Sequence, residues 1–219
     1  METSNLKENV EIIIEQTLGL LKEVYNNNRE DKAVKNDYSN KINLQGSRLV
    51  FPKYSNKEEV RVSEQELRFA FVETFNHYCN EKKINLFYSV ETPTMDNYSG
   101  FAIKNPGCDK NGRSAMFDLV IYDEYLKRRC LIEFKAKNAD EKDHKKDFIK
   151  LNNPNEGGKD EVLRYFIEIL QSSNDGTYKS LNKKINACNI TNPEENIKST
   201  FICYDLEKGN VTAKIENFK

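Results

Sequence analysis

The sequence has no tryptophan, only two histidines and five cysteines, and no long apolar run among its 219 residues. A membrane-spanning helix needs about 18–20 apolar residues in succession, so we expect no membrane segment. A basic stretch followed by an apolar one, which marks a secretory signal, does not open the chain. Lys and Arg number 34 against 35 Asp and Glu, and this balance gives no overall reason to expect a nucleic-acid partner.

The cysteines and histidines are too scattered for a structural zinc site or a disulfide framework. No two cysteines form a CxxC pair, their number is odd, and His77 and His144 lie far apart in the sequence. Structural zinc needs clustered Cys and His, and disulfide scaffolds use an even set of cysteines. We therefore expect a reduced, cytoplasmic protein.

Leu, Ile, Val and Phe make up about a quarter of the chain, which is enough for a packed core. Helical periodicity predicts helices at residues 5–26, 64–81, 143–151, 159–171 and 178–188. Apolar runs rich in β-branched and aromatic residues predict strands at 48–54, 86–90, 115–122, 129–136, 200–204 and 211–215, with a hairpin turn at 207–210. The polar stretches 27–46 and 96–113 are predicted to be a linker and a loop.

These elements divide the chain into an N-terminal helix with a polar linker, residues 1–46, and a main domain, residues 47–219. The order in the main domain is helix, strand, strand, strand, helix, strand, which is an α/β pattern with an antiparallel hairpin at its centre. The N-terminal helix carries an apolar stripe. It either docks on the main domain or forms a surface for a partner protein or a second copy of the chain.

Three charged residues, Asp118, Glu133 and Lys135, interrupt the two central strands. An ionised residue in a core strand costs several kcal/mol unless it is paired or binds a metal. If the strands pair symmetrically about the turn at 124–126, opposed residue numbers sum to about 251, so Asp118 faces Glu133. Since Glu133 and Lys135 share a face of their strand, we expect the three side chains to converge on one patch.

Two converging carboxylates without His or Cys form a hard oxygen site, which suits Mg²⁺ or Mn²⁺ rather than zinc. A nearby ammonium suits anionic chemistry, because it can hold a phosphate, orient an attacking water or stabilise developing charge. This combination of groups is typical of phosphodiester hydrolysis.

The segment Phe117-Asp118, followed after fourteen residues by Glu133-Phe134-Lys135, resembles the PD-(D/E)xK motif of the restriction-endonuclease-like nuclease superfamily, with Phe117 in place of proline. The predicted elements over residues 63–205 are similar to the α-β-β-β-α-β core of that superfamily, with its mixed central sheet. The resemblance implies metal ligation by Asp118 and Glu133 and a catalytic role for Lys135.

In many members of the superfamily the helix before the first strand adds an acidic metal ligand. Glu66 matches that position best, and Glu73 follows seven residues later. However, Ser63-x-x-Glu66 is also a capping-box pattern, which explains this glutamate as part of a helix N-terminus, and the two roles can coexist. For Asp118 the alternative to a metal site is an internal ion pair, for example with Lys135.

The stretch 133–150 carries six lysines against five acidic residues. One interpretation is a solvated helix with pairs of opposite charge four residues apart. The other is phosphate contact beside the active site, in which Lys137, Lys145, Lys146 and Arg113 would bind nucleic acid.

The sequence thus predicts a Mg²⁺-dependent nuclease, with Mn²⁺ as a substitute, acting on DNA rather than RNA as the resemblance implies. One alternative is a catalytically silent nucleic-acid-binding module on the same fold. The other is a protein-interaction module in which the charged residues pair with one another.

Overall fold

The structure, a computed structural model, describes residues 3–30, 47–54, 60–100, 107–137, 139–157, 161–188, 197 and 199–218. In these ranges the chain is an α/β protein with four α-helices, one 3-10 helix (η1) and one seven-stranded sheet. The elements in chain order are α1 (Thr3–Glu30), α2 (Glu64–Lys82), β1 (Phe87–Ser99), β2 (Gly107–Cys108), β3 (Arg113–Tyr122), β4 (Arg128–Ala136), α3 (Glu141–Leu151), η1 (Pro154–Gly157), β5 (Leu163–Leu170), α4 (Asp175–Cys188), β6 (Ser199–Asp205) and β7 (Asn210–Phe218).

The sheet is mixed, as the sequence predicts, with strand order β2-β1-β3-β4-β5-β6-β7. Neighbours from β2 to β4 are antiparallel, β4, β5 and β6 run parallel, and β7 returns antiparallel to β6. In the central hairpin the numbers of paired residues sum to 251 from Leu119–Ile132 to Ile121–Cys130. The predicted register of β3 against β4 is therefore confirmed.

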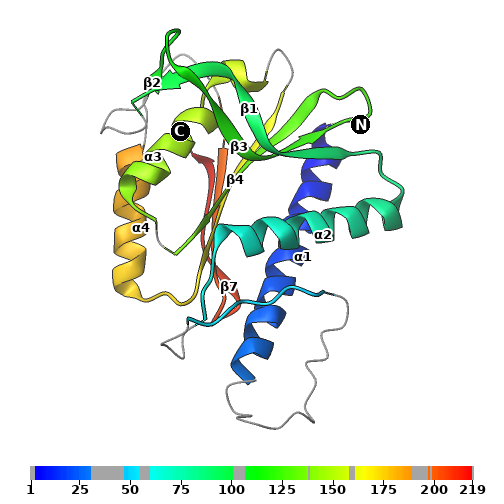
Figure 1. Ribbon diagram of the computed structural model, residues 1–219, viewed down its shortest axis with the longest axis vertical. Coiled ribbons are helices and arrows are strands. Elements are labelled where there is room, and N and C mark those ends of the chain that lie inside the picture. Colours follow the sequence, from blue (N-terminus) through cyan, green and yellow to red (C-terminus); the bar gives the residue numbers. More distant parts are fainter. Residues whose placement is uncertain are drawn as a thin grey trace.

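Helices cover both faces of the sheet (Figure 1). One core joins α1, α2 and one face of the sheet, and it includes Ile13, Phe71 and Ile132. A second core lies under α3 and α4 on the opposite face and includes Phe148 and Leu181. Burial on both sides explains why the central strands are almost continuously apolar.

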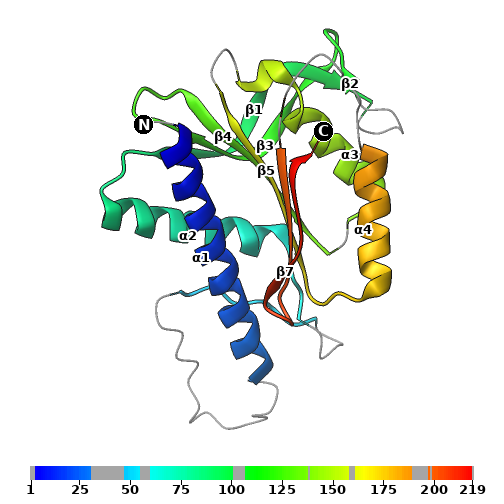
Figure 2. The ribbon, with the colours of Figure 1, turned by 180° about the vertical axis from the view of Figure 1, so that it is seen from behind.

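The N-terminal helix docks on the main domain, which decides between the two arrangements considered for its apolar stripe. Its residues Leu6, Val10 and Leu21 are buried in the same core as α2. The hydroxyl of Tyr78 on α2 donates a hydrogen bond of 2.9 Å to Asn9 Oδ1 on α1. Figure 2 shows α1 crossing in front of α2, and the two helices cover the face of the sheet opposite to α3 and α4.

The predicted helix at 159–171 is wrong, because residues 163–170 form strand β5. Seven of the eight residues of β5 are buried, so apolar side chains occupy both faces. An apolar run of this length fits a buried helix and a buried parallel strand equally well by periodicity alone. Its position between β4 and β6 makes it a strand, and the strand predicted at 200–204 is therefore the fifth of the core rather than the fourth.

Other boundaries also differ from prediction. Helix α1 continues to Glu30, four residues beyond its predicted end, and residues 31–46 of the predicted linker lie outside the described residues. The predicted loop at 96–113 is partly strand, because β1 extends to Ser99 and pairs with β2. In place of the strand predicted at 48–54, the described residues show one isolated bridge between Lys53 and Val60.

No helix in the described ranges combines the length and the apolar content that crossing a bilayer requires. The thiols of Cys79, Cys108, Cys130 and Cys203 are free.

Candidate functional site

The predicted site lies where backbone pairing between β3 and β4 ends. The last pair of the ladder toward this end is Leu119–Ile132. Beyond it, the Asp118 carboxylate accepts the backbone N–H of Phe134 through Oδ2, at 2.7 Å. A side-chain oxygen thus takes the hydrogen bond that a strand carbonyl would normally accept, and it ties Asp118 to the strand that carries Glu133 and Lys135.

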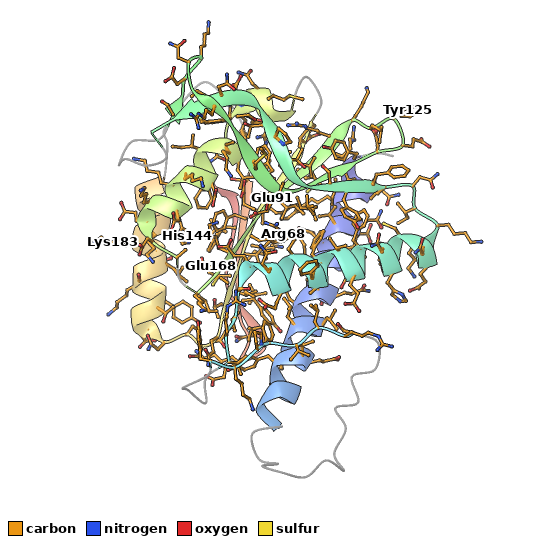
Figure 3. The ribbon with its side chains drawn as sticks, in the orientation of Figure 1. Arg68, Glu91, Tyr125, His144, Glu168 and Lys183 are labelled. Carbon is orange, nitrogen blue, oxygen red and sulfur yellow. The ribbon has the colours of Figure 1, made fainter. Side chains whose placement is uncertain are left out.

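Arg68 of α2 holds the other oxygen of Asp118. Its Nη2 donates to Asp118 Oδ1 at 2.6 Å, and its Nη1 lies 2.5 Å from Glu91 Oε1 on β1. Figure 3 shows Arg68 and Glu91 beside each other at the start of α2. Asp118 therefore pairs with Arg68 and not with Lys135, the partner considered from the sequence.

Glu91 has an unusual backbone for a residue inside a strand. Its φ is 48°, in the left-handed region, and its two neighbours pair with Leu119 and Phe117 on either side of Asp118. A non-glycine residue in this region carries about 1–3 kcal/mol of strain. The distortion of β1 therefore lies directly opposite Asp118.

Glu133 is buried, with 1% of its surface exposed, and its Oε1 lies 2.6 Å from Lys150 Nζ on α3. Burial raises the pKa of Glu133 well above its usual range, and the nearby Asp147 carboxylate raises it further, while Lys150 opposes both effects. Among these influences, the Lys150 ammonium is the one that favours the ionised form of Glu133 at this depth.

Lys135 pairs with two carboxylates. Its Nζ lies 2.8 Å from Asp147 Oδ2 and 3.5 Å from Glu64 Oε1. Burial would lower the pKa of Lys135, but the surrounding carboxylates, chiefly Asp147 and Glu64, outweigh burial and raise it. Lys135 is thus an ammonium at neutral pH, which can donate hydrogen bonds and offset negative charge but cannot accept a proton.

These residues form two sets of ion pairs, one around Arg68 and one around Lys135 and Lys150, which we together call the charged cluster. It contains five carboxylates and three cations from α2, β1, β3, β4 and α3: Glu64, Arg68, Glu91, Asp118, Glu133, Lys135, Asp147 and Lys150. Asp147 links its two lysines, since Oδ1 lies 2.8 Å from Lys150 and Oδ2 the same distance from Lys135. Glu133 and Lys135 are thus joined through Asp147 and Lys150, and Asp118 contacts the same strand through the backbone N–H of Phe134.

Glu66 lies apart from the charged cluster. Its carboxylate accepts the hydroxyl of Ser63 and lies 3.4 Å from Arg61 Nη1, so its contacts belong to the start of α2. Glu64, two residues earlier, is the acidic residue of α2 that reaches the cluster. Glu73 also points elsewhere, because it accepts a hydrogen bond from Ser47.

The sequence interpretation missed Arg68, Asp147 and Lys150 as site residues, although helical spacing contains a signal for each. Asp147 and Lys150 precede Phe148 and Leu151, which form the buried stripe of α3, and both are themselves buried. Buried charged residues on an apolar stripe require partners.

A buried pair next to the charged cluster fixes α3 on the sheet. His144 Nε2 lies 2.9 Å from Glu168 Oε2, and both side chains are fully buried. Glu168 is the register partner of Lys135 across β4 and β5. Figure 3 shows His144 and Glu168 together between α3 and the sheet, with Tyr125 far away at the tip of the β3–β4 hairpin.

The four residues considered for nucleic-acid contact come from three separate places. Lys137 directly follows β4 and is exposed, and its ammonium lies over the ring of Tyr54 at 5.1 Å. Lys145 and Lys146 are half-buried on α3, and Arg113 is exposed at the start of β3. In the sequence, Lys146 directly precedes Asp147 of the charged cluster, and Lys137 lies two residues after Lys135.

The charged cluster fits a metal ion only in part. Among the described residues, no three Asp, Glu, His or Cys side chains form a group that could hold a metal. Mg²⁺, however, is often bound by one or two carboxylates and completes its shell with waters and substrate phosphates. Asp118 and Glu133 supply two such carboxylates, and both already accept hydrogen bonds or ion pairs from nitrogen groups.

In comparisons with known proteins, no protein-family model, curated protein or solved structure matches the chain.

Proposed function

We propose that the chain is a metal-dependent nuclease of the PD-(D/E)xK type, which hydrolyses phosphodiester bonds in DNA rather than RNA. The convergence of Asp118, Glu133 and Lys135 at the end of the β3–β4 ladder carries the proposal. The order of elements supports it, since α2, β1, β3, β4, α3 and β5 follow the helix and strand order that the motif implies, with the two-residue β2 inserted.

In this proposal the carboxylates of Asp118 and Glu133 hold Mg²⁺, together with the backbone carbonyl of Phe134. The bound ion would supply a Lewis acid and a water of lowered pKa. Lys135 remains protonated, so its role is to orient the attacking water and to stabilise negative charge at the phosphate. Asp147 keeps the Lys135 ammonium in position through the 2.8 Å contact.

A cleavage assay tests the proposal directly. The purified chain is incubated with Mg²⁺ or Mn²⁺ and with duplex DNA, single-stranded DNA and RNA. We expect Asp118→Asn and Lys135→Met each to reduce cleavage by about 10²–10³-fold, the range for losing one group that stabilises a transition state. Lys179→Ala, an exposed change on α4, is the matched control and should cleave like the wild type. Metal-dependent cleavage that survives both site substitutions would sink the proposal.

The charge pairing favours a second candidate, a catalytically silent binding or interaction module on the same fold. Asp118 is already paired with Arg68 and Glu133 with Lys150, so the carboxylates are neutralised without a metal. The two candidates differ in a thermal-shift titration with Mn²⁺. A metal at 100 times its Kd should stabilise the nuclease by about 2.7 kcal/mol, whereas the silent module should show no shift that Asp118→Asn removes.

A further inference from the structure

Lys150 is held by three oxygen atoms inside the protein. Its Nζ donates to the backbone carbonyl of Met116 at 2.7 Å, and it lies 2.6 Å from Glu133 Oε1 and 2.8 Å from Asp147 Oδ1. The Lys150 side chain is 3% exposed. The ring of Phe117, centred 5.6 Å from the nitrogen, lies beside it.

These contacts equal in number the N–H donors of the side chain. A lysine ammonium has three N–H donors and no acceptor; here it makes one hydrogen bond, to Met116, and two ion pairs, to Glu133 and Asp147. Two carboxylate oxygens, at 2.6 and 2.8 Å, stabilise a positive charge on Lys150 although almost no water reaches it.

The three oxygens are the kinds that a hard metal ion takes in proteins: two carboxylates and one backbone carbonyl. They come from three different elements, β3, β4 and α3, and converge on one point. Two are formally anionic, so the group needs a buried cation to be stable. The sequence supplies that cation covalently, on the same helix that carries Asp147.

The two lysines of the charged cluster differ in what surrounds them. Lys135 contacts Glu64, which is more than one-third exposed, so Lys135 lies toward solvent. Lys150 contacts only buried carboxylates and a backbone carbonyl. The Lys135 side chain is 12% exposed and that of Lys150 only 3%, so Lys135 is the more accessible of the two.

We propose that Lys150 is a tethered cation, whose ammonium fills a three-oxygen cation site that a second metal ion would otherwise occupy. The existence of this filled site does not depend on catalysis. Its consequence, that the chain uses a single divalent metal ion at Asp118 and Glu133, rests on the nuclease proposed above. Lys150 is then a positioning residue, which fixes the Glu133 carboxylate and balances its charge.

The test counts bound Mn²⁺ in EDTA-washed protein by calorimetry and by the fall in the free Mn²⁺ spectroscopic signal. Lys150→Ala should empty the cation site and leave room for an ion, so this variant should bind one more Mn²⁺ per chain than the wild type. Lys150→Met removes the charge but keeps the volume filled, so it should bind no additional ion. Lys142→Ala, an exposed change on the same helix, controls for the loss of a charge from α3.

The counts separate this proposal from the proposed function. One ion in the wild type and two in Lys150→Ala supports both. No ion in the wild type and one in Lys150→Ala supports the tethered cation and contradicts the metal site that the nuclease proposal places at Asp118 and Glu133. Two ions in the wild type, or equal counts in the wild type and Lys150→Ala, overturn the tethered cation.

If Lys150→Ala does not fold in EDTA, the variants are instead refolded from urea, once with Mn²⁺ and once with EDTA. Recovery of the native circular dichroism spectrum with Mn²⁺ and not with EDTA supports a metal in the place of the ammonium, provided that Lys150→Met gains nothing from Mn²⁺. Failure of Lys150→Ala to recover with Mn²⁺ overturns the proposal.

Discussion

Removing one charge of the buried Glu133–Lys150 pair should destabilise the protein more than removing both. Lys150→Met takes from Glu133 the cation that lies 2.6 Å from it, while Asp147 keeps Lys135 at 2.8 Å. Breaking a buried pair from one side costs about 3–5 kcal/mol, because the remaining charge has no compensation. At about 2–4 °C per kcal/mol for a chain of this size, the melting temperature should fall by roughly 6–20 °C.

The double variant Glu133→Gln/Lys150→Met removes both charges and nearly keeps the volume. A buried ion pair replaced by uncharged groups of similar size is often close to neutral in stability. Glu133→Gln should therefore destabilise the wild type by about 1–3 kcal/mol and yet stabilise the Lys150→Met background. This change of sign between backgrounds is the decisive feature of the prediction.

The assay is urea denaturation in EDTA at neutral pH, followed by circular dichroism, for the wild type, both single variants and the double variant. Lys142→Met on the exposed side of α3 is the control and should change the free energy of unfolding by no more than about 0.5 kcal/mol. If the two substitutions add within about 0.5 kcal/mol, Glu133 and Lys150 do not depend on each other and the description of the buried pair is refuted.

Three further predictions address other parts of the site. Glu66→Ala should cost about 1 kcal/mol of stability and leave Mn²⁺ binding unchanged. In the proposed nuclease, Glu64→Ala should reduce cleavage because it removes a partner of Lys135; equal effects of the two substitutions on cleavage would contradict the assignment. His144→Ala should cost at least about 3 kcal/mol in urea denaturation, since it strands the buried Glu168 carboxylate, and a loss below 1 kcal/mol would count against that pairing. Phe148→Ala should cost about 3–5 kcal/mol, because Phe148 is fully buried in the core under α3, and an unchanged urea midpoint would contradict this packing.

The part of the site that depends on strand register could be predicted from the sequence. A short turn between two apolar strands leaves few pairings, and the side-chain period of two then fixes which residues share a face. Charged residues inside apolar strands are conspicuous because of their cost. For these reasons the sequence alone predicts that Asp118, Glu133 and Lys135 lie close together.

The helical contributions to the site were harder to predict, because they depend on how each helix is rotated over the sheet. Glu64 and Glu66 are both acidic, both lie in the first turn of α2, and only one faces the charged cluster. Leu67 and Phe71 are fully buried, and the positions three residues before them, Glu64 and Arg68, share their face of the helix. Spacing from the buried stripe was thus a better guide than the capping-box pattern.

For strand β5, the local sequence pattern does not distinguish a strand from a helix. Residues 163–170 are apolar or aromatic at six positions, with Arg164 and Glu168 between them, and this arrangement also fits the stripe of a helix. The strand is selected by tertiary context, because only a parallel strand fills the place between β4 and β6. Arg164 and Glu168 are both buried there, and each has a polar partner, Arg164 the carbonyl of Leu151 and Glu168 the ring of His144.

The charged cluster has a net negative charge of its own, although the chain as a whole is nearly neutral. Counted formally, five carboxylates against three cations leave two negative charges, which one divalent ion would offset. Without that ion the cluster repels a phosphate backbone, and the net charge of −1 gives no general attraction to compensate. DNA binding should therefore be weak in EDTA and should strengthen with Ca²⁺ or Mg²⁺, with a shallow dependence on salt in the metal-free protein. Fluorescence anisotropy with labelled DNA measures both effects, and tight, steeply salt-dependent binding in EDTA would show that the chain attracts DNA through a surface other than the charged cluster.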